Sequence, residues 1–472
     1  MKRYLIVLVI MFSLPALLKA QTLITKKIFS TYVNDSVSIK IWLPKDYSAD
    51  ERYPVLYEFI YDHTNYIAAT ASNIWDIPKL IVVWAQIEGG NEHYSSPNLS
   101  DKGEKYYSFI KNEFINYISK EYNTANIRIA AGLSQGADYV NYILRNNPSL
   151  FNSYLIFSTE YPIKYTPDVS SYTAKIKDSI SYFIAIANDE KERMKFANQL
   201  YDSLRTCPYI KIKKEYFANA SHGYSILYAL PDALLFTFED YNTVREKLPG
   251  ETLFSYYNST LKEKKEKFGN INFHSFIYQI LQLSDIKSFS VGDINNFIDS
   301  VYSLKESMDI DLFNIGYFLR TKGLYQSAIK AYQMEILKKQ TTGKTAMDEV
   351  SVYFQLSKTY DLAGKPDEAL RVLQDGYEKT KSNDEALLYT IGYYYIDKHI
   401  DIKKGIEILL SMENEKHTVS VRFIKSSDEV YAKIATGYWE LKNKKQAKLF
   451  VNKALEINPK NEVVLKLKAL MK

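Results

Sequence analysis

The sequence predicts an α/β domain with a mostly parallel sheet flanked by helices, followed by an all-α region that ends in helical repeats. Strand-like apolar runs alternate with helix-like segments as far as Tyr241, and beyond it the strand pattern ceases. Within residues 308–472, helix-length segments with small residues recur at similar intervals. With 472 residues, of which 46% are hydrophobic, the chain can bury more than one core.

The N-terminus has the three parts of a secretory signal peptide. Residues 1–3 are basic at two positions, residues 4–18 are mostly apolar, and Lys19-Ala20-Gln21 closes the segment. The apolar run is short for a bilayer span, which favours a cleaved signal over a permanent anchor. We therefore expect residues 1–20 to be removed near Ala20 and the mature protein to be secreted or periplasmic.

Gly132-Leu133-Ser134-Gln135-Gly136 has the pattern of a nucleophile elbow, the sharp turn from strand to helix that exposes a serine above an α/β-hydrolase sheet. The apolar run 126–131 before it has strand length, and residues 138–145 after it have helical spacing. The alternative is a plain glycine-bounded turn. The flanks favour Ser134 as a nucleophile and residues 21–241 as an α/β-hydrolase domain.

A nucleophilic serine needs a base and an acid, and α/β-hydrolases supply them in the order serine, acid, histidine. The strand-like run 182–187 ends at Asp189, and a second such run, 210–217, precedes a loop of small residues that carries His222. A lone loop histidine is usually only solvated. The position of His222 after the last strand favours a general base.

Asp189 is the preferred acid because it follows directly on a strand. Glu190, Glu192 and Glu160 compete with it, since the motif sets the chain order of the acid but not its spacing. Asp189, Glu190 and Glu192 could instead form a charge cluster at a helix N-terminus.

The oxyanion hole should use the backbone N–H of Gln135, the residue after the nucleophile. Its second donor should come from the loop after the strand-like run 53–60, where we assign Asp62. His63 in the same loop is interpreted as an ordinary loop histidine.

These segments resemble the serine esterases of the esterase D and enterochelin-esterase type, within the α/β-hydrolases. The resemblance runs from about residue 26 to 241 and includes "YPVLYEF", "FIKNEFINYISKEYNTANIRIAAGLSQGA" and "ANASHGYSILYALPDALLF". It implies Ser134 as nucleophile, Asp189 as acid and His222 as base. The sequence departs from the family at Ala137, where a second glycine is common, at the turn 60–63, and at the loop 89–95, which lacks the usual arginine.

Residues 242–307 are predicted to form a helical linker region, and residues 308–472 a repeat domain. The clearest copy, 428–461, has Ala435, Ala447 and Ala454 at intervals of 12 and 7 and then Pro459, which resembles the tetratricopeptide repeat. Further copies are expected at 350–383 and about 308–342, with a degenerate one at 384–413. Such arrays bind a protein or peptide partner, or only orient the neighbouring domain.

The remaining signals exclude other classes. No histidine, cysteine or carboxylate group has metal-ligand spacing, and there is no phosphate-binding glycine loop, so we expect neither metal nor cofactor. A net charge of +5 over this length does not indicate nucleic acid.

The sequence therefore predicts an exported serine hydrolase that cleaves a small-molecule or glycan-linked carboxylic ester. It predicts no membrane span after cleavage of the signal. One alternative is an inactive hydrolase fold that acts as a scaffold through its repeats, and another is a peptidase on the same fold.

Overall fold

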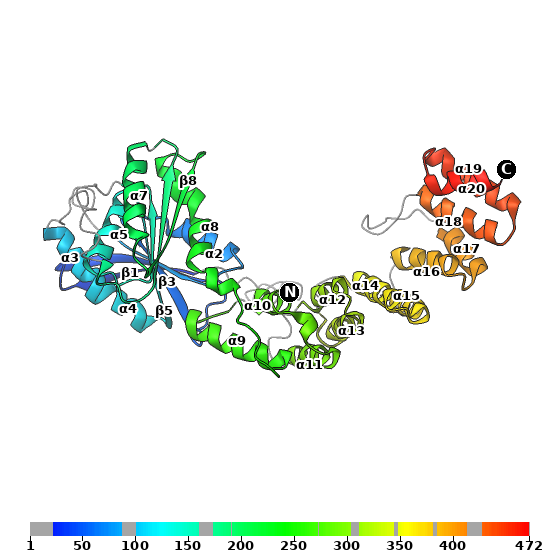
Figure 1. Ribbon diagram of the computed structural model, residues 1–472, viewed down its shortest axis with the longest axis horizontal. Coiled ribbons are helices and arrows are strands. Elements are labelled where there is room, and N and C mark those ends of the chain that lie inside the picture. Colours follow the sequence, from blue (N-terminus) through cyan, green and yellow to red (C-terminus); the bar gives the residue numbers. More distant parts are fainter. Residues whose placement is uncertain are drawn as a thin grey trace, which may run out of the picture. The chain divides into compact units, whose positions relative to one another are not determined.

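The computed structural model describes residues 22–86, 101–159, 173–189, 191–271, 273–303, 311–343, 348–380, 385–412 and 427–471 (Figure 1). The expected signal peptide, residues 1–20, lies outside the described residues. Contacts divide the chain into two compact units. The first comprises Met1–Glu251 and Ser255–Ser284, and the second Thr252–Phe254 and Asp285–Lys472.

The first unit is built on an eight-stranded sheet with the order β1-β2-β4-β3-β5-β6-β7-β8. The strands are β1 Thr22–Ser30, β2 Asp35–Leu43, β3 Tyr53–Phe59, β4 Ile81–Ala85, β5 Thr124–Leu133, β6 Ser153–Phe157, β7 Ile180–Ala187 and β8 Ile210–Phe217. β2 pairs antiparallel with both β1 and β4, whereas every pairing from β4 through β8 is parallel. The predicted mostly parallel sheet is confirmed.

The centre of this sheet is buried on both faces. All residues of β3 and β6 are buried, while the edge strand β1 is mostly exposed. The run Tyr53–Phe59 is apolar at every position but one, because helices cover both sides of a parallel strand. A buried polar residue in such a run is therefore unusual, and Glu58 of β3 is one.

Helices cover both faces of the sheet (Figure 1). α3, α4, α5 and α7 lie on one face, and α2 and α8, which contact each other, lie on the other. Their bounds are α2 Thr64–Asn73, α3 Asp101–Phe109, α4 Ile115–Glu121, α5 Gln135–Asn146, α7 Lys191–Leu204 and α8 Ser225–Thr237, with a π-helical turn at Ile110–Phe114 and 3₁₀ turns at His222–Tyr224 and Glu239–Asn242. Since strands β3 to β8 run the same way, the loops that follow them meet at one edge, where α/β proteins place their sites.

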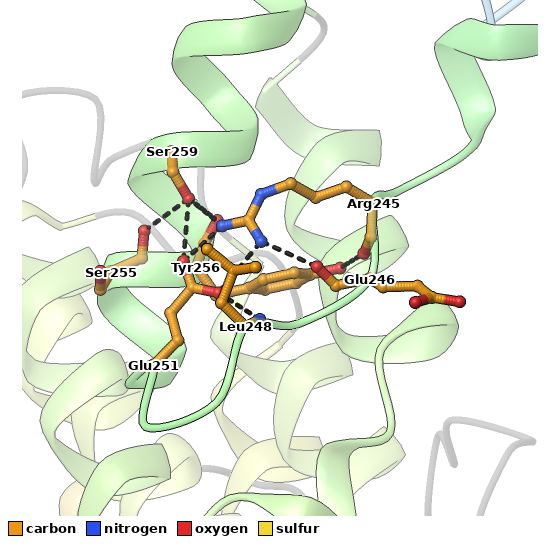
Figure 2. Close-up of polar contacts among 7 residues, drawn as sticks. All are labelled: Arg245, Glu246, Leu248, Glu251, Ser255, Tyr256 and Ser259. Carbon is orange, nitrogen blue, oxygen red and sulfur yellow. Dashed lines mark hydrogen bonds and ion pairs between the residues drawn. The ribbon is translucent and has the colours of Figure 1, made fainter.

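This unit also includes α10 Phe273–Leu283 and, from Ser255 onward, α9 Leu253–Phe268. A polar network ties the start of α9 to the loop before it (Figure 2). The Arg245 guanidinium donates to both carboxylate oxygens of Glu251, one at 3.0 Å, and to Ser259 of α9. Glu251 also accepts from the Leu248 amide at 3.0 Å, and the Tyr256 hydroxyl donates to the Arg245 carbonyl at 2.6 Å. The hydrogen bond from Arg245 lowers the pKa of Glu251, so this pair stays ionised.

The other end of α9 is held against the start of β3. The Arg52 side chain donates to the Lys265 carbonyl at 3.1 Å, and Asn270 donates to the Arg52 and Lys79 carbonyls at 3.0 Å each. Gly269 has φ +85°, and a Cβ there would lie 2.5 Å from the Arg52 carbonyl oxygen. The close approach therefore requires glycine at this position. These contacts attach α9, within the expected linker 242–307, to the sheet.

In the described part of the second unit, every element is helical. Its helices are α11 Val291–Tyr302, α12 Leu312–Thr321, α13 Tyr325–Thr342, α14 Glu349–Leu362, α15 Pro366–Thr380, α16 Glu385–Asp397, α17 Ile402–Ser411, α18 Ser427–Glu440, α19 Lys444–Ile457 and α20 Glu462–Leu470, after a 3₁₀ turn at Ile286–Ser288. α12–α13, α14–α15, α16–α17 and α18–α19 are contacting pairs, one for each expected repeat copy. The predicted helical repeat region is confirmed.

Small residues allow these helices to approach closely. A Cβ on Gly376 would lie 2.6 Å from the Tyr353 ring, and one on Gly405 would lie 2.7 Å from the Gly392 carbonyl oxygen. Several helices begin with an aspartate or asparagine whose side chain accepts from an amide of the first turn, as in Asp348 of α14. Helix capping and small residues at the helix–helix contacts together determine where these helices begin and how they pair.

Among the described helices, none is both long enough and apolar enough to cross a bilayer. α13 has 18 residues but carries Lys330, Glu335 and Lys338.

Candidate active site

Ser134 occupies a strained turn between β5 and α5. β5 ends at Leu133, α5 begins at Gln135, and Ser134 between them has φ 54° and ψ −118°. The Ser134 amide donates to the Phe157 carbonyl at 2.9 Å, and its carbonyl accepts from Asp138 at 3.0 Å. A backbone of this kind costs about 1–3 kcal/mol and persists where the surrounding structure enforces it. The geometry is that of the elbow which the motif predicts.

Both glycines of the motif are required by close packing. A Cβ on Gly132 would lie 2.3 Å from the backbone of Gly136, and one on Gly136 would lie 2.5 Å from the Phe59 carbonyl oxygen. Neither neighbour is a side chain that could move aside. The first glycine lets α5 close onto β5, and the second lets α5 close onto β3.

We expect Gly132→Ala to lower the free energy of unfolding by about 1–3 kcal/mol, because the new methyl group overlaps the Gly136 backbone. Denaturant unfolding measures this change. Gly223→Ala is the control, since a Cβ at Gly223 has no neighbour within 4 Å. Equal stability of the two variants would show that the turn relaxes without cost.

Hydrogen bonds connect the elbow to the loop that carries His222. Phe157, which accepts from Ser134, ends β6 and precedes Ser158, a buried residue with φ 55°. The Ser158 hydroxyl donates to the Ser225 hydroxyl at 2.7 Å, and Ser225 donates to the His222 carbonyl at 3.1 Å. This chain of contacts brings the predicted nucleophile and the predicted base to the same edge of the sheet.

Asp189 lies beside His222. It follows β7, and its Oδ1 accepts a hydrogen bond from the His222 backbone amide at 3.0 Å. The neighbouring Asn188 amide donates to the Ala220 carbonyl at 3.0 Å, so the loops after β7 and β8 are joined side by side. The structure thus brings the preferred acid and the base together.

The competing acids are placed differently. Glu192 is on α7, its side chain is 75% exposed, and it pairs with Lys195 one turn along the helix at 2.9 Å. Such a pair is typical of a solvated helix surface. Glu190 and Glu160 lie outside the described residues. Of the described alternatives, only Asp189 contacts the His222 loop.

The predicted oxyanion donors come from two places in the chain, the start of α5 and the turn after β3. Gln135 is the first residue of α5, and the N-terminus of a helix favours negative charge. The Asp62 carboxylate is held by Lys40 and by the Thr64 hydroxyl, the latter at 2.6 Å. Burial alone would raise the pKa of Asp62, but the hydrogen bonds from Lys40 and Thr64 lower it. Asp62 could therefore contribute its amide to the hole, and not a protonated carboxyl.

His63 is not an ordinary loop histidine, contrary to the expectation from sequence. Its ring Nδ1 lies 2.6 Å from Oε1 of Glu58, and its amide donates to Oε2 of the same carboxylate at 2.7 Å. Glu58 is 2% exposed. The one sequence signal for this pair was an acidic residue inside the otherwise apolar run of β3.

The three departures from the resembled family fall in different surroundings. Ala137 is fully buried in α5, so the elbow has room for the extra methyl group. The turn 60–63 is the one held by Glu58. The loop 89–95 lies outside the described residues.

Residues 30–201 match the model of the family described as "Putative esterase", and residues 428–461 match a tetratricopeptide repeat model. The first match spans β2 to α7 and includes Ser134 and Asp189, and the second coincides with α18 and α19. The chain therefore carries an α/β-hydrolase domain of the esterase family and a tetratricopeptide repeat. Its esterase domain places it among the carboxylic ester hydrolases.

Solved structures with a similar chain path have low sequence identity. An uncharacterised protein from Capnocytophaga ochracea is 15% identical, covering 75% of this chain and 94% of its own, with a TM-score of 0.49. An IroE-like serine hydrolase from Shewanella oneidensis is 19% identical over 57% of this chain and 96% of its own, with a TM-score of 0.45. The BES protein from Bacillus cereus is 17% identical over 47% and 98%, with a TM-score of 0.41. No curated protein matches this sequence.

Proposed function

We propose that this chain, which carries an esterase-family domain, cleaves carboxylic esters through an acyl-enzyme formed on Ser134, with His222 as base and Asp189 as acid. The observation that carries the proposal is the strained elbow at Ser134, joined by hydrogen bonds through Ser158 and Ser225 to the His222 loop. The amide of His222 in turn binds Asp189.

In this mechanism the Ser134 hydroxyl oxygen attacks the ester carbonyl carbon while His222 takes the hydroxyl proton. The carbonyl oxygen becomes an oxyanion, which the backbone amides of Gln135 and Asp62 stabilise. Collapse of the tetrahedral intermediate breaks the ester C–O bond, and His222 returns the proton to the leaving alcohol. Water then attacks the acyl-enzyme by the same steps and releases the acid.

The substrate class we propose is a small-molecule or glycan-linked ester. The alcohol part of an ester is the leaving group, and it takes one proton from His222, which is half-buried. No metal or cofactor is needed for these steps.

The repeat unit is proposed to bind a protein or peptide partner. Stacked helix pairs of this kind form extended surfaces, and α12 to α19 supply four such pairs. The partner would not contribute to the chemistry of the esterase domain.

We also propose export, from the basic, apolar and small-residue segments of residues 1–20. Expression of the full-length chain in a bacterial host should yield a protein in the periplasm or medium that begins near Gln21. N-terminal sequencing of fractionated cells checks this. Cytoplasmic protein that still begins at Met1 would contradict it.

The mechanism is tested by a fluorophosphonate probe, which labels serines activated by a neighbouring base. The mature protein should be labelled once, and peptide mapping should place the label on Ser134. It should hydrolyse short-chain aryl esters and leave a panel of peptides intact. An unlabelled protein would instead support the inactive scaffold, and peptide cleavage would support the peptidase.

A further inference from the structure

Glu58 is an acidic residue in the interior of the sheet. It lies on β3 and is 2% exposed, and the strand around it is otherwise apolar. Burying an ionisable group is costly unless its oxygens are hydrogen-bonded. Both oxygens of Glu58 bind one residue, His63, through its backbone amide at 2.7 Å and its ring Nδ1 at 2.6 Å.

The two bonds close a tight turn of the chain. Between Glu58 and His63, the Tyr61 amide donates to the Phe59 carbonyl at 3.0 Å, and Ile60 has φ 76°. A positive φ is unfavourable for a β-branched residue, so this turn would not keep its shape on local preference alone. The Glu58 side chain bridges its two ends and holds it.

This turn lies against the nucleophile elbow. Phe59 is paired with Gly132 across the sheet, and a Cβ on Gly136 would lie 2.5 Å from the Phe59 carbonyl and 3.7 Å from the Ile60 side chain. Within the turn, the amides of Tyr61 and His63 have acceptors, whereas no described residue accepts from the amide of Asp62. The Asp62 amide is therefore available to donate to a substrate oxygen.

We propose that Glu58 and His63 act as a clamp that positions the turn 59–62, and with it the Asp62 amide, for stabilisation of the oxyanion. This inference rests on the proposed function. Glu58 and His63 are positioning residues, since they act on the turn and not on the substrate. The clamp would take the place of the acidic-glycine turn that the resembled esterases have at this point.

The clamp has a titratable element. Burial raises the pKa of Glu58 to about 7, although its hydrogen bonds with His63 act in the opposite direction. Burial alone would lower the pKa of His63, but the hydrogen bond with Glu58 raises it. The other charges acting on the pair are Asp62, which raises both pKa values, and Lys40, which pairs with Asp62. Protonation of Glu58 below about pH 7 would therefore weaken an acceptor that the turn needs.

The test compares Glu58→Gln with wild type in the mature protein, using an aryl ester and an aryl boronic acid that forms a tetrahedral adduct on Ser134. The amide keeps the shape of Glu58 but lacks its charge, so kcat and boronate affinity should fall about 10- to 100-fold while KM stays unchanged. The limb of the kcat–pH profile that Glu58 contributes near pH 7 should be lost. Asn65→Ala is the matched control on α2, since Asn65 binds Trp42 and not the turn.

His63 distinguishes positioning from proton transfer. An asparagine side chain in place of the imidazole would bring an N–H donor near the position of Nδ1. His63→Asn should therefore retain most of kcat, whereas His63→Ala should lose it as Glu58→Gln does. If His63→Asn were as inactive as His63→Ala, the imidazole would be carrying protons and the clamp proposal would be wrong.

Hydrogen–deuterium exchange separates this inference from the proposed function. In Glu58→Gln the amides of residues 60–63 should exchange faster, whether or not the protein is active. Faster exchange in a protein whose wild type is inactive would overturn the proposed function but leave the clamp as a feature of the fold. Unchanged exchange, or an unchanged kcat in an active protein, would overturn the clamp.

Discussion

Ser134→Ala is expected to abolish ester hydrolysis, with kcat lower by about 10⁴- to 10⁶-fold. The reason is that the variant has no oxygen to form the acyl-enzyme, while binding and the oxyanion donors remain. Initial rates with a short-chain aryl ester measure the loss, and the size of the effect makes a coarse assay sufficient.

Loss of activity must be separated from loss of structure. Ser149→Ala serves as the matched control, because Ser149 is an exposed serine of the same unit whose hydroxyl contacts only Asn147 among the described residues. Ser134→Ala should unfold at the same denaturant concentration as this control. Substantial turnover by Ser134→Ala would remove this serine from the mechanism.

Asp189→Asn is expected to lower kcat by about 10⁴-fold. An amide at this position can still accept from the His222 backbone but cannot stabilise a positively charged imidazole. The same substitution at Glu192, Glu192→Gln, should leave the rate unchanged because that side chain is exposed and pairs with Lys195. Steady-state kinetics of the two variants under identical conditions make the comparison.

Three outcomes would reassign the acid. A fully active Asp189→Asn would exclude this residue, and parallel loss of activity in Glu190→Gln or Glu160→Gln would identify a competitor. A loss of activity in Glu192→Gln would mean that the exposed surface of α7 contributes to the active site. Only a loss confined to Asp189 supports the proposed triad.

The elbow could be predicted from sequence because it is a local structure. The elbow requires glycine at positions 132 and 136, two residues before and two residues after Ser134. These five residues and the segments beside them are therefore sufficient to identify it. The helical repeats were predictable for the same reason, since each pair of helices places its small residues at regular intervals. In both cases neighbours in sequence are neighbours in space.

The acid was harder to predict. Sequence order placed Asp189, Glu190, Glu192 and Glu160 downstream of the elbow without separating them. The contact that favours Asp189 joins residues 33 positions apart, and it depends on how the ends of β7 and β8 align. The register of neighbouring strands is set when the sheet packs, so it could not be read from the sequence.

The sequence alone was sufficient to predict the α/β class, the elbow at Ser134 and the paired helices. These features depend on hydrophobic periodicity and on turn residues, which are properties of short segments of the chain. The tertiary structure alone decided which side chains share the site edge and that His63 is held by a buried Glu58. Such pairings form only when folding brings distant segments together and removes water from them. Because a buried charge is unfavourable without a hydrogen-bonding partner, the fold must place such a partner next to it.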